Sequence, residues 1–212
     1  MKKIFLMLVL VSSLSFAISL NQVRSDLNAF NICAQDSVEM SIRTIVESKV
    51  GKQIVSIYLV QKGISKSYSE IRNSLMNQRS IVNGNRMKVI DLNTNKARVL
   101  PYNGEALEVK KYMPFNPLES GDWQEPVAYE GSLFMIKGTN GTLYYDSKKK
   151  RIEKIENNDS EKSVLTTFSY DEGNNLKKMV VSVLVSGVET IVTTEILALR
   201  SSVNFPDKLF DF

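Results

Sequence analysis

The residue types that most often carry out catalysis are scarce in this chain. It contains no histidine, which excludes Ser-His-Asp and Cys-His catalysis and removes the commonest metal ligand. Cys33 is the only cysteine, so the chain can form neither an internal disulfide nor a zinc cluster. A lone cysteine of this kind is usually a small, buried apolar residue. The sequence therefore predicts no metal site and no cofactor.

Carboxylates are the remaining candidates for acid and base chemistry, at Asp91, Asp122, Glu125, Asp146 and Asp171. Glycoside cleavage needs an acid and a second carboxylate across one bond, but no spacing in the sequence ties two of these residues to one site. Asp91, Asp146 and Asp171 lie beside expected hairpin turns, where aspartate normally accepts hydrogen bonds from backbone N–H groups. We therefore predict that the protein is not an enzyme, with a carboxylate-based hydrolase as the weakest alternative.

One local basic cluster occupies residues 148–151 (KKKR), followed by Lys154. It could dock on anionic lipid headgroups, where each charge contributes about 1 kcal/mol. Its position in an expected hairpin turn after Asp146 favours ordinary solvated lysines instead. Elsewhere Lys and Arg are dispersed among acids, and this pattern excludes a nucleic-acid partner.

The first seventeen residues have the pattern of a cleavable signal peptide. Lys2 and Lys3 precede an apolar run, and Ser15 and Ala17 supply small residues before a cleavage point. Serines interrupt the apolar run, which is shorter than the roughly twenty residues of a spanning helix. We expect a mature single domain over 18–212 that is exported to the periplasm. Without the two lysines, 25 basic residues face 23 acidic ones.

The apolar periodicity changes along the mature chain. Leu20, Val23, Leu27 and Phe30 recur at helical spacing and predict an amphipathic helix over 20–32, capped by Ser19 or Asn21. Alternating or β-branched segments separated by Asn- and Gly-rich turns follow, and they predict strands. These segments are 38–43, 54–60, 66–75, 80–82, 86–92, 97–100, 133–137, 142–146, 151–156, 163–170, 176–185 and 188–199.

Residues 103–131 interrupt this pattern with prolines, the only tryptophan and a short helical turn expected over residues 106–113. A connection of this length in a compact sheet serves either as a mobile lid or as a crossover that plugs one end of a barrel. The fold class expected overall is mainly β (α+β). It is a strongly curved antiparallel sheet or incomplete β-barrel of about ten strands, with the N-terminal helix in its concavity and a helical or loop lid.

Several motifs resemble the outer-membrane lipoprotein carrier family, the LolA-like lipoprotein-sorting proteins. Residues 67–72 (SYSEIR) form a strand ending in arginine, which leads through 78–82 to an Asn-Gly hairpin at 83–85 and a strand at 87–92. The closing segment 203–210 (VNFPDKLF) is also similar to the family's, as is the helix that follows a cleavable signal. The resemblance covers most of the mature chain.

The resemblance implies a carrier whose apolar cavity holds the acyl chains of lipoproteins or another acylated ligand. Such carriers receive cargo from an inner-membrane release complex and pass it to an outer-membrane acceptor. Strand alternation and the resemblance together predict the cavity lining: Val38, Met40, Ile42, Val55, Ile57, Leu59, Ile71, Val89, Phe168, Val181 and Val183. The family latches its lid with an arginine where this chain has Gln61-Lys62-Gly63, so the latch candidates are Lys62, Arg43 and Arg72.

A different class of function remains open from the same residues. Periodicity reports burial and does not say whether the concave face is filled by the protein itself. If it is filled, the same fold would serve as an envelope sensor or protein-interaction module without lipid transport.

Overall fold

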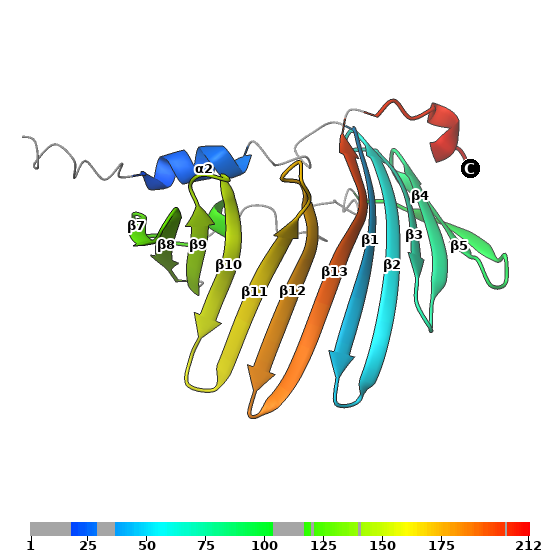
Figure 1. Ribbon diagram of the computed structural model, residues 1–212. Helices are drawn as coiled ribbons and strands as arrows, with labels where there is room; N and C mark the ends of the chain where they lie inside the picture. Colours follow the sequence, from blue (N-terminus) through cyan, green and yellow to red (C-terminus); the bar gives the residue numbers. More distant parts are fainter. Residues whose placement is uncertain (1–17, 29–36, 104–116, 120, 140, 202) are drawn as a thin grey trace, which may run out of the picture.

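The structure is a computed structural model that describes residues 18–212 except 29–36, 104–116, 120, 140 and 202. The expected signal peptide, Cys33 and the helical turn expected over 106–113 lie outside the described residues. Those described form one sheet, a helix and two 3-10 turns (Figure 1). Their bounds are α2 (Leu20–Asn28), β1 (Ser37–Ser48), β2 (Gly51–Lys62), β3 (Lys66–Arg72), β4 (Asn77–Asn83), β5 (Arg86–Asp91), β6 (Ala97–Pro101), η3 (Pro117–Glu119), β7 (Val127–Glu130), β8 (Leu133–Gly138), β9 (Gly141–Asp146), β10 (Arg151–Asn158), β11 (Lys162–Tyr170), β12 (Leu176–Val185), β13 (Val188–Ser201) and η4 (Asp207–Phe210).

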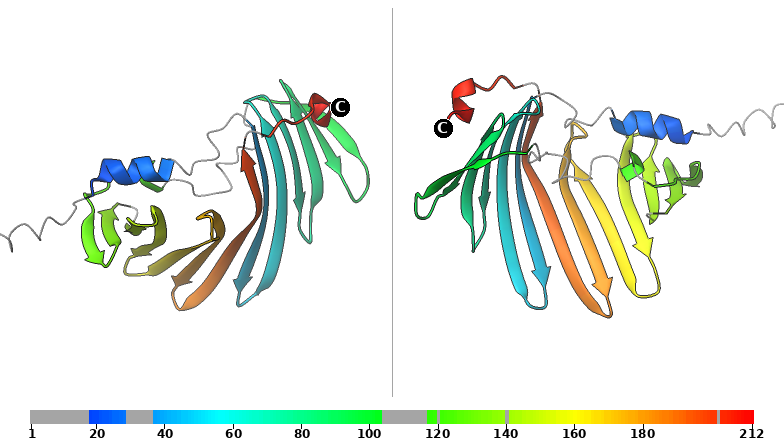
Figure 2. Two further views of the ribbon diagram at one scale, coloured as in Figure 1. Left: turned by 45° about the horizontal axis from the view of Figure 1, so that its top comes forward. Right: turned by 180° about the vertical axis from the view of Figure 1, so that it is seen from behind.

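All thirteen described strands belong to one antiparallel sheet in the order β6-β5-β4-β3-β2-β1-β13-β12-β11-β10-β9-β8-β7. Two meanders therefore run outward from the middle, where β1 pairs with β13 along eleven residue pairs. The sheet is open, because β6 and β7 stand at its two edges. Its strands are strongly curved, so it has a concave and a convex face (Figure 2).

Short turns join neighbouring strands at the positions where Asn and Gly residues predict them. The β12–β13 turn places Ser186 and Gly187 at φ angles of 49° and 78°, in the left-handed region. Two-residue hairpin turns with both central residues at positive φ match the twist of the strands they join. Tight turns of this kind make consecutive strands pair, whereas β6 and β7, which no tight turn joins, stand at opposite edges.

Helix α2 covers the concave face at the β8–β10 end of the sheet (Figures 1 and 2). Ser19 caps its first turn, with the Gln22 amide 3.2 Å from Ser19 Oγ, as one of the two expected caps. Val23 and Leu27 bury the apolar stripe of the helix against the sheet. The cluster they join also contains Leu20, Leu118, Trp123, Ile136, Leu143, Tyr145 and Ile152.

Two polar contacts fix the helix on this cluster. Tyr145 donates a hydrogen bond of 2.6 Å to the buried carboxylate of Asp26. Burial and this hydrogen bond both raise the pKa of Tyr145, so the phenol remains a donor. At the start of the helix, the Leu20 N–H donates to Glu125 Oε2 at 2.8 Å. Glu125, considered above as a catalytic acid, therefore accepts a hydrogen bond from one of the N–H groups that a helix leaves unpaired at its first turn.

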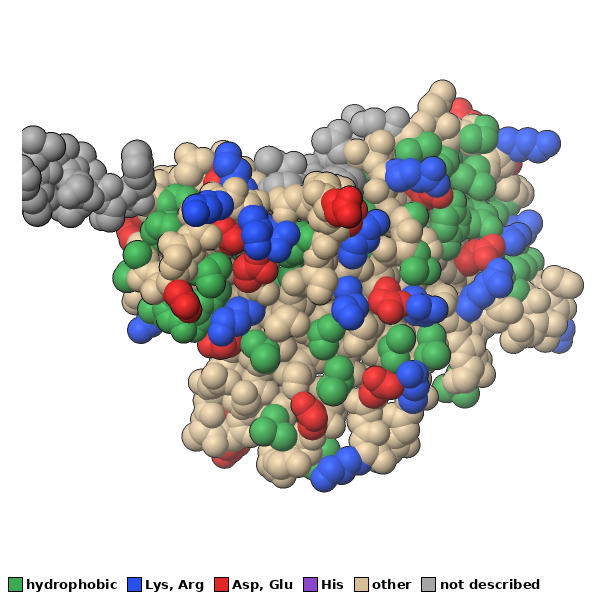
Figure 3. Space-filling model, viewed as in Figure 1, with side chains coloured by type: hydrophobic (Ala, Val, Ile, Leu, Met, Phe, Trp, Pro, Cys, Tyr) green, Lys and Arg blue, Asp and Glu red, His purple; other side chains and the backbone are tan. Residues whose placement is uncertain are grey.

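The C-terminal segment packs on the convex face at the other end of the sheet. Phe210 of η4 is fully buried in a cluster with Val60 and Ile81, and Phe205 and Leu209 pack against that cluster. Figure 3 shows this face, with hydrophobic side chains gathered near the C-terminal segment and charges of both signs spread over the middle strands. Helix α2 and the C-terminal segment thus cover opposite faces of the sheet.

The structure confirms the expected curved, open antiparallel sheet with an N-terminal helix, and it corrects the strand count. The sheet has thirteen described strands instead of about ten. One of them, β7, was not expected, because it is a short edge strand of four exposed residues that follows Pro126. The strand expected over 66–75 ends at Arg72.

We predict that Tyr145→Phe lowers the free energy of unfolding by about 1–3 kcal/mol, because Oδ2 of the buried Asp26 carboxylate loses the hydrogen bond from Tyr145, while Gln22 still donates to Oδ1. Urea unfolding at pH 7 measures the change. Tyr129→Phe is the matched control, since Tyr129 is exposed and its hydroxyl has no hydrogen bond among the described residues. Equal stability of Tyr145→Phe and wild type would show that this contact does not hold the helix.

Candidate functional site

All eleven predicted lining residues lie on the concave face. Residues directly opposite each other on paired strands share a face. One such row joins Met40, Leu59, Ser69, Ser80 and Val89 across five strands. The other lining residues fall in parallel rows of the same face: Ile42-Ile57-Ile71, Thr44-Val55, Thr194-Met179-Phe168, Val192-Val181, Thr190-Val183 and Val38-Gln61.

Five of these residues are buried in the middle of the sheet. Val38, Met40, Ile42, Ile57 and Leu59 have exposed fractions of 0–9% and form one cluster with Ile196. Val55 and Ile71 pack against the cluster and are half-buried. Phe168 packs against a different cluster, the one that Val23 and Leu27 of α2 join. Much of the predicted lining therefore belongs to the protein's own interior.

A half-buried valine surface adjoins the buried cluster, toward the β1–β2, β10–β11 and β12–β13 turns. It comprises Val46, Val55, Val164, Val181, Val183 and Val192, which share the concave face of five strands. Val46, Val164 and Val192 were not among the predicted residues. Continuing the two-residue alternation to the ends of β1, β11 and β13 would have found them.

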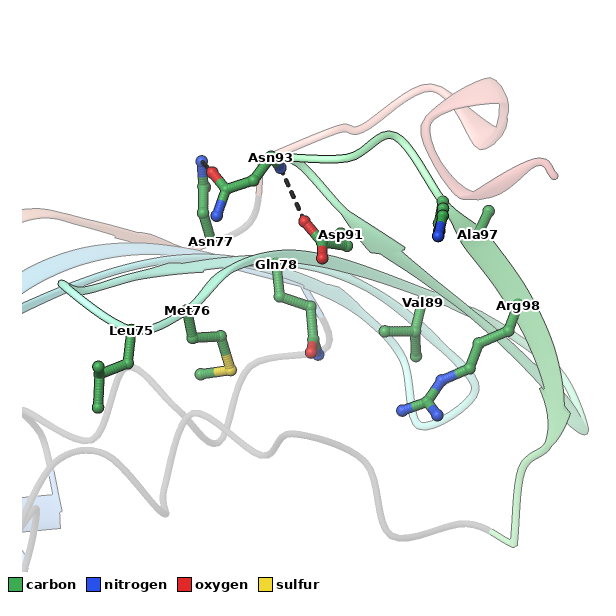
Figure 4. Close-up of a pocket in the computed structure, with 10 residues that line it drawn as sticks. Leu75, Met76, Asn77, Gln78, Val89, Asp91, Asn93, Ala97 and Arg98 are labelled. Atoms are coloured by element: carbon green, nitrogen blue, oxygen red, sulfur yellow. Dashed lines mark hydrogen bonds between the residues drawn. The ribbon is translucent and has the colours of Figure 1, made fainter.

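The concave face becomes polar toward the β6 edge. Ser67, Ser69 and Ser80 are buried there on β3 and β4. Beyond them lies a pocket of about 320 Å³ (Figure 4). Its lining comes from β4, β5, β6 and their connections: Leu75, Met76, Asn77, Gln78, Val89, Asp91, Asn93, Lys96, Ala97 and Arg98.

The three latch candidates lie on the convex face. Lys62 Nζ donates to the Phe205 carbonyl at 3.0 Å and to Asp207 Oδ1 at 2.8 Å. Its described contacts therefore hold the C-terminal segment. Arg43 pairs with Glu195 and Arg72 with Glu70, on the same outer face. A lid contact with 104–116 lies outside the described residues, so the latch stays a prediction.

Glu70 is the centre of a hydrogen-bonded network beside the C-terminal segment. Tyr68 and Arg79 donate to its Oε1, and Arg72 donates to its Oε2 at 2.7 Å. Burial of the carboxylate acts to raise its pKa, but these donors outweigh burial and lower the pKa of Glu70 to about 2. Burial and the bond to Glu70 raise the pKa of Tyr68 to about 12. This is a structural network on the face opposite the valine surface.

Three of the four aspartates considered for catalysis cap turns, as the sequence predicts. Asp91 Oδ1 accepts from the N–H groups of Asn93 and Thr94, and Asp146 Oδ1 accepts from Lys148 and Lys149. Asp171 Oδ1 accepts from the N–H group of Asn175. Among the described residues, no group of three or more acidic or cysteine side chains could hold a metal ion.

The basic cluster at 148–151 is mostly neutralised. Lys149 lies 3.5 Å from Asp146, Lys150 lies 3.5 Å from Asp26, and Arg151 pairs with Glu153. This pairing favours a solvated hairpin turn over headgroup docking. No described helix is long and apolar enough to cross a membrane.

No protein-family model and no curated protein matches the chain. Among solved structures, it is similar to a LolA superfamily protein from Nitrosomonas europaea. The TM-score is 0.55 at 13% sequence identity, over 92% of this chain and 99% of that one. The chain has a LolA-like fold. A putative outer membrane lipoprotein-sorting protein domain from Vibrio parahaemolyticus also matches, with a TM-score of 0.48 at 9% identity over 90% and 95% of the two chains. Within this LolA-like fold, the valine surface is a half-buried apolar part of the concave face.

We expect acid to destabilise the protein partly through Glu70. Its folded pKa of about 2 lies below the ordinary 4.5, so the ionised carboxylate stabilises the fold above pH 4.5. That contribution is lost as the pH falls from 4.5 to 2. Allowing for solvent screening, Glu70→Gln should lower stability at pH 7 by about 1–2 kcal/mol. It should also flatten the acid limb of a stability–pH profile.

The control for this profile is Glu172→Gln, at an exposed turn residue without an ion pair among the described residues. It should reproduce the wild-type profile. An unchanged acid limb in Glu70→Gln would contradict the assigned role of the network.

Proposed function

We propose that this protein is a periplasmic carrier that binds acyl chains of lipid-modified proteins on the valine surface and moves them from the inner to the outer membrane. The partners under this proposal are an inner-membrane lipoprotein-release complex and an outer-membrane acceptor. The mature chain is one domain over 18–212, exported by the signal peptide at 1–17. The half-buried apolar side chains of the valine surface, next to the buried cluster of the concave face, are the observation that carries the proposal.

The energetics of the valine surface suit reversible transport. Valine side chains have no hydrogen-bonding groups and therefore favour hydrocarbon over water. The hydroxyl groups of Thr44, Thr190 and Thr194 lie in the same rows of this face. Each buried methylene of an acyl chain contributes about 0.8 kcal/mol. A long acyl chain therefore gains on the order of 10 kcal/mol, which is partly offset by the loss of its freedom on binding. A carrier needs this intermediate strength to both collect and release its cargo.

The arrangement of covers also supports binding at this place. Helix α2 occupies the concave face at the β8–β10 end, and the C-terminal segment lies on the convex face. Val181 and Val183 lie between these covers in the register and remain half-buried. The LolA-like fold adds support, because the carriers it resembles hold acyl chains inside such a sheet.

A second candidate function is favoured by the solid middle of the sheet. Five predicted lining residues are 0–9% exposed in one packed cluster. In addition, Ile54, Leu165 and Leu184 are 38–46% exposed on the convex face. An envelope sensor or protein-interaction module would use that outer surface and would need no ligand inside.

Val181→Glu tests the carrier proposal, since it places a charge on the valine surface. We expect it to weaken the binding of a fluorescent long-chain fatty acid at least about tenfold, because burying an unpaired carboxylate against hydrocarbon is costly. The matched control is Val180→Glu, at a half-buried neighbour that faces the convex side opposite Thr193. It should bind the probe as wild type does. Equal loss in both variants, or no binding by wild type, would contradict the carrier proposal and leave the interaction module.

Export is tested separately through the residues that precede the cleavage point. When the full-length chain is expressed in a Gram-negative host, intact mass spectrometry of the periplasmic fraction should show a chain beginning at Ile18. Ala17→Arg should abolish processing, because a small residue is needed before the cleaved bond. A wild-type periplasmic chain that retains Met1 would contradict the signal-peptide assignment.

A further inference from the structure

The concave face changes in character along a single direction. The row that starts at Met40 and Leu59 continues through Ser69 and Ser80 on β3 and β4. It then reaches Val89 on β5 and Arg98 on β6. Five strand spacings separate Met40 from Arg98, or about 24 Å at about 4.8 Å each. An apolar region, a zone of small hydroxyl side chains and a charged end therefore follow one another on one face.

The charged end is the pocket between β4, β5 and β6. In Figure 4, Gln78, Val89 and Arg98 extend to the same side of the sheet, away from the C-terminal segment. The pocket's volume of about 320 Å³ is within the range of small-molecule sites, about 300–1,000 Å³. Leu75 and Met76 contribute apolar walls beside the polar groups.

The balance of charge in the pocket is positive. Lys96 and Arg98 line it together with one carboxylate, Asp91. Asp91 already accepts two backbone N–H groups of its turn, at 2.8 and 3.1 Å, and these hydrogen bonds lower its pKa. No ion pair among the described residues involves Arg98 or Lys96. Among the described residues, the exposed Arg98 guanidinium also takes part in no hydrogen bond, so its donors point to no other described group.

We propose that the β4–β6 pocket binds the anionic head group of an amphiphile, a carboxylate or phosphate, whose hydrocarbon chain runs along the exposed Leu75 and Met76 at the β3–β4 turn. This inference rests on the proposed function and adds the polarity of the ligand and the direction in which it lies. Arg98 is the recognition residue, because its planar guanidinium can donate two parallel hydrogen bonds to either oxyanion. Lys96 adds a positive charge, but its ammonium group lacks the planar pair of donors that Arg98 has.

Three probes of equal chain length test the proposal: a long-chain fatty acid, the corresponding alkyl phosphate and the corresponding fatty alcohol. Wild-type protein should bind both anions more tightly than the alcohol. Arg98→Gln should weaken binding of the two anions about fivefold to tenfold and leave the alcohol unchanged, since one charge-assisted contact is lost. Comparison of the two anions shows which oxyanion the pocket prefers.

Lys88→Gln is the matched control, because it removes the same charge from the convex face of β5, opposite Ile81 and Val99. It should bind all three probes as wild type does. Equal wild-type affinity for anions and alcohol, or an equal loss of all three probes in Arg98→Gln, overturns the head-group site and leaves the acyl carrier standing. Failure of wild type to bind any probe overturns both.

Discussion

The pairing of β1 with β13 is the constraint on which the rest of the structure depends. These strands are about 140 residues apart in the sequence, at Ser37–Ser48 and Val188–Ser201, and eleven residue pairs join them in the middle of the sheet. Without this contact, the chain would be two separate meanders, each with an additional exposed edge. The same pairing brings Met40 and Ile42 against Ile196 and so creates the buried apolar cluster at the centre.

An open sheet has two large faces and the chain covers each of them only in part. Helix α2 covers the concave face at one end through Val23, Leu27 and the Tyr145–Asp26 contact. The C-terminal segment covers the convex face at the other end, held by Phe210 and by Lys62 and Lys66 on Asp207. The valine surface lies on the concave face of the middle strands, and the β4–β6 pocket lies near the β6 edge of that face. The partial covering makes both surfaces candidates for a ligand.

Local patterns in the sequence predicted the elements well, because strand alternation and turn chemistry act between near neighbours. They also placed all eleven predicted lining residues on one face, since the alternation of apolar and polar residues determines which face of the sheet a side chain is on. Alternation does not determine depth, so it could not separate the buried Leu59 from the half-buried Val181. The partners of Lys62 and Arg72 depend on where the C-terminal segment packs and on which strands pair. Only the folded chain determines these non-local contacts.

Methyl NMR of selectively valine-labelled protein, titrated with a long-chain fatty acid, tests most directly whether the concave face takes hydrocarbon. The account predicts saturable shift changes at Val46, Val55, Val164, Val181, Val183 and Val192, with Val180 on the opposite face unaffected. Changes confined to convex-face valines, or no saturable change at any valine, would contradict it.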